Sequence, residues 1–210
     1  FGMGVLMQFY FNNTTPQSIL WYITTNESSV VLNSTSTLGN ELNQWNHWAV
    51  SRSGSNLSVF INGVRALTTS SAGGTFTACT NASYPNLING GYGGATSAYP
   101  LGGYISDVRV VKGTAVYNPT SSTCTVPTAP LTAITNTKLL LNMADGQALD
   151  SAAQNNLTLY GTADTSTTQQ KFGTSSLFLE GDSDTDFVQL HGVEDFVGPF
   201  TIECWARAAD

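Results

Sequence analysis

The stretch that decides the fold runs Trp45-Asn46-His47-Trp48-Ala49-Val50-Ser51-Arg52-Ser53-Gly54 and continues, after Ser55 and Asn56, as Leu57-Ser58-Val59-Phe60-Ile61-Asn62-Gly63. Apolar and polar residues alternate in it over two short runs, which is the pattern of strands with one buried face. The pair Asn62-Gly63 is a strong signal for a two-residue type I′ hairpin turn, because both positions need a positive φ. We therefore predict a three-stranded antiparallel meander within residues 45–69.

Short runs of β-branched and aromatic residues continue on both sides of this meander. None has a 3.6-residue period long enough to predict a helix. Many short strands separated by turn residues predict an all-β protein with an antiparallel β-sandwich. The further predicted strands are residues 5–11, 19–24, 30–32, 104–111, 138–143, 157–160, 176–179, 187–190 and 200–207.

Composition narrows the class of protein. The chain has 210 residues, 41% of them hydrophobic and 10% charged, with a formal net charge of −7. This length and hydrophobic content can bury a core, and the low charge argues against intrinsic disorder. The acidic balance excludes a typical nucleic-acid-binding protein, and no apolar run approaches the about 20 residues of a membrane span.

The charge is unevenly distributed along the chain. Residues 1–132 carry four basic and three acidic residues, a net +1, whereas residues 133–210 carry three basic and eleven acidic residues, a net −8. At the end of the first segment, residues 119–132 contain three prolines and predict a linker. The acidic segment indicates a solvated face, a cation site or a charged interface.

Four regions of the sequence together resemble the laminin-G-like domains of the concanavalin A-like lectin/glucanase superfamily. They are the meander, residues 103–113, Lys171-Phe172-Gly173 and Phe200-Thr201-Ile202-Glu203-Cys204-Trp205. The resemblance implies a jelly-roll sandwich. The run from Arg109 to Tyr117, followed by Pro127-Thr128-Ala129-Pro130-Leu131, is similar to domains of tailed-phage virion and fibre proteins, such as those of cyanophages.

The order of these regions differs from the order in that family. There the Lys-Phe-Gly and Phe-Thr-Ile-Glu-Cys-Trp strands precede the meander, and here they follow it. The resemblance therefore implies that residues 1–118 are the second half of a sandwich, residues 119–132 a linker, and residues 133–210 the first half of a following or complementing sandwich. Three explanations stay open: a window from a tandem array, a circular permutant, or donation of one half to a neighbouring chain.

Catalytic residues are not expected. Glucanases of this superfamily place carboxylates in a Glu-x-Asp-x-x-Glu pattern on one strand, whereas residues 180–186 have another spacing and Glu203 stands alone on its strand. Neither His47 nor His191 has a nearby nucleophile in a triad-like context. We predict a non-enzymatic protein.

Two loops carry candidate binding residues. The glycine-rich loop within residues 82–100 offers aromatic faces and amides for a carbohydrate, and its candidate residues are Tyr84, Asn86, Asn89, Tyr92 and Tyr99. The alternating acids Asp182, Asp184 and Asp186 would suit Ca²⁺ if the loop curls around the ion, with Asp150 and Glu180 as helpers. Without a ligand, the first would be a plain sandwich loop and the second an acidic turn.

Several other side chains are assigned structural roles. Trp45, Trp48 and Trp205 are predicted in the core, and Cys204 as a small buried apolar residue. Asp107 and Arg109 share a face of one strand and are expected to pair. Cys79 and Cys124 lie in loops, where a disulfide is an open alternative.

The resemblance implies a virion or fibre module on the phage particle surface or tail. Its expected partners are other virion proteins, copies of itself and host surface polysaccharide, without nucleic acid or a membrane span. The alternatives are an architectural module assembled by half-domain complementation and a secreted bacterial adhesin or lectin at the cell surface.

Overall fold

The computed structural model describes part of the chain in detail. It covers residues 8–12, 18–26, 29–37, 43–70, 86–88, 102–143, 157–180, 186–190 and 198–208. Of these, residues 8–12, 18–26, 29–37 and 86–88 and Leu190 are described by their backbone course alone. Within these ranges the chain forms strands, turns and loops and no helix, so no helix there could cross a membrane.

Fourteen strands lie within the ranges just given, and all of their pairings are antiparallel. Each predicted strand corresponds to one of them: strands 157–160, 176–179 and 187–190 have the predicted ends, the others have shifted ends, and residues 5–7 of the first lie outside the described ranges. They are β1 (Gln8–Asn12), β2 (Ser18–Asn26), β3 (Ser29–Thr37), β4 (Asn46–Ser53), β5 (Asn56–Ile61), β6 (Val64–Thr69), β7 (Asn86–Ile88), β8 (Gly103–Lys112), β9 (Thr137–Leu141), β10 (Leu157–Tyr160), β11 (Asp164–Ser166), β12 (Ser176–Leu179), β13 (Phe187–Leu190) and β14 (Phe200–Ala208).

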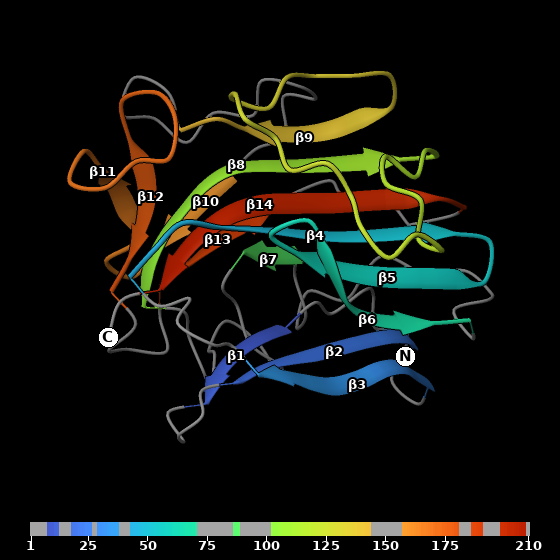
Figure 1. The fold of residues 1–210 in the computed structure, drawn as a ribbon. Coiled ribbons are helices and arrows are strands. Elements are labelled where there is room, and N and C mark those ends of the chain that lie inside the picture. Colours follow the sequence, from blue (N-terminus) through green and yellow to red (C-terminus); the bar gives the residue numbers. More distant parts are fainter. Residues whose placement is uncertain are drawn as a thin grey trace.

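One eight-stranded sheet dominates the structure. Its strand order is β11-β12-β8-β14-β4-β5-β6, and β9 also pairs with β8 (Figure 1). Two smaller sheets have the orders β1-β2-β3 and β10-β13-β7. The large sheet draws on both segments of the chain, because β14 lies between β4 and β8.

The predicted meander forms strands β4, β5 and β6. Asn62 and Gly63 have φ values of 49° and 82°, as a type I′ turn requires. The side chain of Asn62 ties the turn to the start of β4, because its Oδ1 accepts a hydrogen bond from the backbone N–H of His47 at 2.9 Å. A Cβ on Gly63 would lie 2.8 Å from the carbonyl oxygen of Cys124, so the residue also permits a close approach of the later chain.

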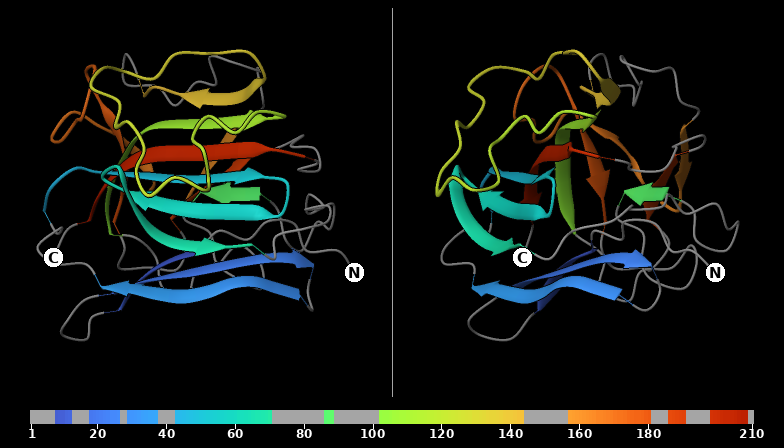
Figure 2. Two further views of the ribbon diagram at one scale, coloured as in Figure 1. Left: turned by 45° about the vertical axis from the view of Figure 1, so that its right-hand side comes forward. Right: turned by 90° about the vertical axis from the view of Figure 1, so that its right-hand side faces the viewer.

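The two faces of the large sheet have different neighbours (Figure 2). The inner face packs toward β10, β13 and β7, and the main apolar core joins its side chains to Val188 of β13 and Leu157 of β10. This confirms the antiparallel sandwich. Trp48 and Trp205 are buried, as predicted, and Trp45 is half-buried.

The outer face is crossed by residues 113–136, which we call the strap. The strap leaves the end of β8, runs over the outer face to β6 and returns to β9 (Figure 1). At β6 it forms an isolated bridge between Val64 and Thr123, and the backbone N–H of Arg65 donates to the carbonyl of Ser122 at 2.9 Å. The stretch predicted as a linker, residues 119–132, thus lies against the sheet.

Candidate functional site

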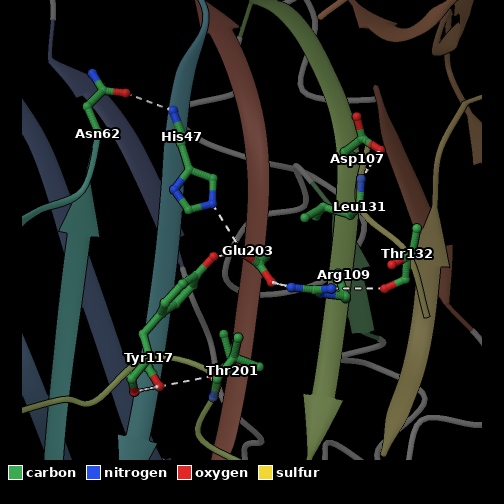
Figure 3. A network of polar contacts seen from close by, with 11 residues as sticks. His47, Asn62, Asp107, Arg109, Tyr117, Leu131, Thr132, Thr201 and Glu203 are labelled. Carbon is green, nitrogen blue, oxygen red and sulfur yellow. Dashed lines mark hydrogen bonds and ion pairs between the residues drawn. The ribbon is translucent and has the colours of Figure 1, made fainter. Parts of the chain in front are cut away.

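A cluster of polar side chains lies between the outer face of the large sheet and the strap (Figure 3). Side chains alternate between faces along a strand, and this rule sets Ser51 of β4 and Thr201 of β14 on the outer face. Residues of the same face that lie farther along the sheet are His47 on β4, Arg109 on β8 and Glu203 on β14. Three strands from both segments of the chain therefore meet in one cluster.

Glu203 is the centre of this cluster, and its side chain has no exposed surface. Its Oε1 accepts hydrogen bonds from Nε and Nη2 of Arg109 at 2.8 and 2.5 Å, so two guanidinium nitrogens share one carboxylate oxygen in this ion pair. Its Oε2 accepts the hydroxyl of Tyr117 at 2.5 Å and lies 3.2 Å from Nε2 of His47. A buried carboxylate with this many donors is compensated on both oxygens.

The surroundings shift the pKa values in this cluster. Burial acts to raise the pKa of Glu203, but hydrogen bonds from His47 and Tyr117 and the charge of Arg109 outweigh it, so the pKa lies below its usual value. Burial and the negative charge of Glu203 raise the pKa of Tyr117. Burial also raises the thiol pKa of Cys204 to about 12 and of Cys124 to about 11, and both carry free thiols that are poor nucleophiles.

The strap supplies hydrogen-bond partners to the outer face of the sheet. Ser51 donates its hydroxyl to the carbonyl of Tyr117 at 2.7 Å, and Ser58 donates to the carbonyl of Pro119 at 2.6 Å. Arg109 Nη1 donates to the carbonyl of Thr132 at 2.9 Å. Thr201 accepts the backbone N–H of Val116 at 2.9 Å. The strap is therefore bound along its length by side chains of the sheet.

Asp107 lies near this cluster, and its expected pairing with Arg109 is wrong. The residue has a φ of 52°, next to an irregularity where the register of β8 against β14 shifts, so the simple alternation of side chains fails there. Its carboxylate accepts the backbone N–H of Leu131 in the strap at 3.3 Å, whereas Arg109 binds Glu203. Burial raises the pKa of Asp107 to about 6, although the bonds from Leu131 and Ser106 act in the other direction.

An aromatic group continues the cluster toward the acidic segment. The rings of His47 and Trp205 lie 5.3 Å apart between centroids, and the ring of Phe172 meets Trp205 edge-on at 6.0 Å. The ammonium of Lys171 lies 4.1 Å from the centroid of Trp205, a cation–π contact. The Lys-Phe-Gly run thus packs on β14.

The polar groups of this cluster bind one another and hold the strap on the sheet. A glycosidase needs an acid and a second carboxylate about 5 to 10 Å apart across a sugar, both reachable by substrate. Glu203 is covered by the strap, and both of its oxygens bind protein donors. Asp107, a second acid near this cluster, is itself buried and bound to the strap.

The predicted carbohydrate residues fall largely outside the described ranges. This is so for Tyr84, Asn89, Tyr92 and Tyr99. Asn86 begins β7, where it is the register partner of Leu190 in β13. Residues 86–88 of the predicted loop are therefore part of the sheet β10-β13-β7.

The predicted calcium residues Asp182 and Asp184, and the helper Asp150, also lie outside the described ranges. Asp186 is buried, and its carboxylate accepts the hydroxyl and the backbone N–H of Thr162, both at 2.7 Å, and the backbone N–H of Glu180 at 3.0 Å. Burial acts to raise the pKa of Asp186, but these hydrogen bonds outweigh it and lower the value. Among the residues that the structure describes, no three metal-ligating side chains gather. Asp186 thus stabilises the turn after β10 by its hydrogen bonds to Thr162, and calcium binding stays a prediction.

Sequence reasoning missed the ion pair of Glu203 with Arg109. The available signal was that Arg109 and Glu203 each lie within a strand of mainly apolar residues, where an unpaired buried charge would be costly. What could not be obtained from the sequence is that β8 and β14 are neighbours, although 87 residues separate the end of β8 from the start of β14.

Comparison with known proteins gives one match. Residues 3–115 match the family described as the concanavalin A-like lectin/glucanases superfamily. This range contains β1 to β8 and excludes β14. No curated protein and no solved structure matches the chain.

Proposed function

The chain belongs to the concanavalin A-like lectin/glucanase superfamily, and from this membership we propose that it is a non-enzymatic carbohydrate-binding module of a phage virion or fibre. The observation that carries the non-enzymatic part is the state of Glu203. Its carboxylate is buried and fully bound by Arg109, Tyr117 and His47, so it offers no proton or nucleophile to a substrate.

The same geometry supports a binding site in loops. Sugar sites need an open surface with aromatic faces and hydrogen-bonding groups. Around β14, the inner face of the large sheet is filled by the apolar core and the outer face is bound by the strap. We therefore propose that host surface polysaccharide binds at the loop that carries Tyr84, Asn86, Asn89, Tyr92 and Tyr99.

Single substitutions on the full chain test this assignment. Purified wild type, Tyr92→Ala and Tyr99→Ala are applied to an array of bacterial capsular polysaccharides and lipopolysaccharides. We expect a loss of at least tenfold in binding for each variant, because removal of a stacked ring forfeits most of its contact with a sugar. Tyr160→Ala is the matched control, since Tyr160 is 39% exposed, lies outside the loop and should leave binding unchanged.

Two results would contradict the proposal. One is an absence of wild-type binding across the whole array, and the other is equal binding by the wild type and both loop variants. Repeating the array in Ca²⁺ and in a chelator tests the acidic residues at the same time. If Asp182 and Asp184 hold Ca²⁺, binding of calcium to the protein should be lost in the double variant Asp182→Asn/Asp184→Asn.

The virion assignment rests on the similarity of residues 109–131 to tailed-phage domains. Genes for capsid and tail proteins beside the coding sequence would support it, whereas genes for secretion would support an adhesin at a bacterial surface. An architectural module is the second candidate, and the observation that favours it is the shared sheet. Strands from both segments meet there, so such a sheet can join separate copies.

A further inference from the structure

An exposed aromatic ring lies at the end of β10. Tyr160 is 39% exposed, and every other aromatic side chain that the structure describes is buried or half-buried. Tyr160 is also the first residue of a turn, because its carbonyl accepts the backbone N–H of Ala163 at 3.3 Å. The apolar core does not include this ring, so its place at the surface is not explained by packing of the sandwich.

The ring of Tyr160 is held from one side by a buried neighbour. It stacks on the ring of Phe187, its register partner on β13, with 4.4 Å between the centroids and 14° between the planes. Phe187 is 3% exposed, so the covered face of the tyrosine ring rests on a fixed support. A ring that is already ordered loses little conformational entropy when a ligand group stacks on its open face.

Carboxylates adjoin this ring through the same turn. The hydroxyl of Thr162 lies 2.7 Å from Oδ2 of Asp186 and 2.8 Å from Oε2 of Glu180. Glu180 is exposed, and so is Asp164, which follows the turn. We call this group of exposed residues the corner, and it consists of Tyr160, Thr162, Asp164 and Glu180.

The two exposed carboxylates of the corner have no internal counter-ion. All seven lysines and arginines of the chain lie within the described ranges, and none of them forms an ion pair with Glu180 or Asp164. The segment that carries the corner, residues 133–210, has a net charge of −8. An open aromatic face beside uncompensated carboxylates is complementary to a cation that also has a flat apolar surface.

From this we propose that the corner is a docking surface for a basic segment of a partner protein, in which an arginine stacks on Tyr160 and pairs with Glu180. The guanidinium group suits both contacts, because it is planar, stacks on aromatic faces and donates two parallel hydrogen bonds to a carboxylate. The ammonium group of lysine is a strongly hydrated point charge and suits them less well. The proposal does not depend on glycan binding, for which Tyr160→Ala is the control.

A metal ion is the other cation to consider at these carboxylates. It would use the oxygens of Glu180 and Asp164 and would give the ring of Tyr160 no part in binding. The aromatic ring therefore distinguishes the two occupants, and a substitution of Tyr160 is the decisive variant.

Fluorescence anisotropy with fluorescein-labelled hexa-arginine tests the proposal on the full chain. The titrations are made with a chelator and at low ionic strength, so that exposed charges are only weakly screened. Tyr160→Leu keeps the net charge and removes the ring, and we expect about fivefold weaker binding. Tyr160→Phe is the matched control, because it keeps the ring, and its affinity should stay within about twofold of the wild type.

Two further titrations test the carboxylate and the choice of arginine. Glu180→Gln should weaken the binding of hexa-arginine about threefold, as loss of an exposed ion pair does. Hexa-lysine should bind the wild type more weakly than hexa-arginine, because it lacks the planar group.

Three results would overturn the proposal. The first is no binding of hexa-arginine by the wild type. The second is equal binding by the wild type and Tyr160→Leu, which would mean that negative charge alone attracts the peptide. The third is binding of hexa-lysine as tight as that of hexa-arginine, which would remove the role given to the guanidinium group. Since Tyr160 is exposed, denaturant unfolding should show that Tyr160→Leu remains folded under the conditions of the titration.

Discussion

The two faces of the large sheet are built from the same three strands by different means. On the inner face, Val50 of β4, Val110 of β8 and Ile202 of β14 contribute to an apolar core. On the outer face, His47, Arg109 and Glu203 of the same strands form a polar cluster that the strap covers. One face is stabilised by burial of apolar surface and the other by compensation of buried charge.

The two faces should therefore differ in how far a substitution lowers the free energy of unfolding. An apolar core loses free energy in proportion to the volume removed, and a similar side chain can substitute. A buried ionic cluster depends on all its members, because removal of one leaves another buried without a partner. The outer face should therefore be the less tolerant of the two.

Glu203→Ala should give the largest loss. It leaves Arg109 buried without its counter-ion, for which a destabilisation of about 3–5 kcal/mol is typical. Denaturant unfolding of both proteins at pH 7 measures the difference. The double variant Arg109→Met/Glu203→Leu should recover at least half of the loss, because it removes both charges. A loss of under about 1 kcal/mol for Glu203→Ala would mean that water reaches the pair.

The pH dependence of this loss separates the two faces. The pKa of Glu203 in the folded protein is lowered from its usual 4.5, so its contribution to stability is present above that value and is lost as the pH falls below it. The difference between wild type and Glu203→Ala should therefore shrink when unfolding is measured at progressively lower pH.

Leu141→Ala tests the inner face. Leu141 on β9 has no exposed surface and belongs to the main core, so the cavity should cost about 2–5 kcal/mol. The loss should be independent of pH because no charge is involved. Leu141→Met is the control, with an expected loss below about 1.5 kcal/mol. If Leu141→Ala proved more pH-dependent than Glu203→Ala, the distinction between the faces would be wrong.

The inner face was largely predictable from the sequence. Alternation in residues 48–52 and 57–61 located strands β4 and β5, and Asn62-Gly63 located the turn between β5 and β6. These are local signals, since side-chain direction in a strand repeats every two residues. The predicted burial of Trp48 on this face followed from the same pattern, whereas the buried Trp205 lies on the outer face beside His47.

The outer face was not predictable, because it depends on which distant strands are neighbours. The pairing of Asp107 with Arg109 was inferred from their spacing on one strand. The irregularity at Asp107 defeats that inference, and the actual partner, Glu203, lies 94 residues away from Arg109 in the sequence. Residues 119–132 of the strap were predicted as a linker because their prolines exclude a central strand, and this rule does not indicate what a segment packs against.

Asp107→Asn should remove a loss of stability that the wild type shows as the pH rises. The folded pKa of Asp107 is about 6 and its usual value is 3.8, so the folded protein binds this proton more tightly than the unfolded chain. The wild type should therefore lose roughly 2–3 kcal/mol relative to Asp107→Asn as the pH rises from 4 to 7. An asparagine also suits the φ of 52° and keeps an oxygen for the backbone N–H of Leu131.

Unfolding of both proteins by denaturant at several pH values measures this prediction. Asp164→Asn is its matched control, because Asp164 is exposed, and this variant should follow the wild type across the pH range. A stability difference between wild type and Asp107→Asn that stays constant from pH 4 to 7 would show that Asp107 titrates normally.

Tyr117→Phe should have the smallest effect, because it removes one hydroxyl and keeps the ring. The lost hydroxyl donates to Glu203 at 2.5 Å, and a hydrogen bond to a charged group contributes about 1.5–3 kcal/mol. Arg109 and His47 remain on the carboxylate, so we expect a loss near the lower limit. Denaturant unfolding measures it, and Tyr160→Phe, at a half-exposed tyrosine, should change stability by less than about 0.5 kcal/mol.

A second readout tests the direction of coupling between these two groups. The negative charge of Glu203 raises the pKa of Tyr117 together with burial, so in the folded wild type this phenol should ionise above its usual range. An ultraviolet titration of wild type minus Tyr117→Phe isolates that one group. If the difference spectrum shows a phenol that ionises near pH 10, Tyr117 is exposed to water, and the strap does not seal the outer face around Glu203.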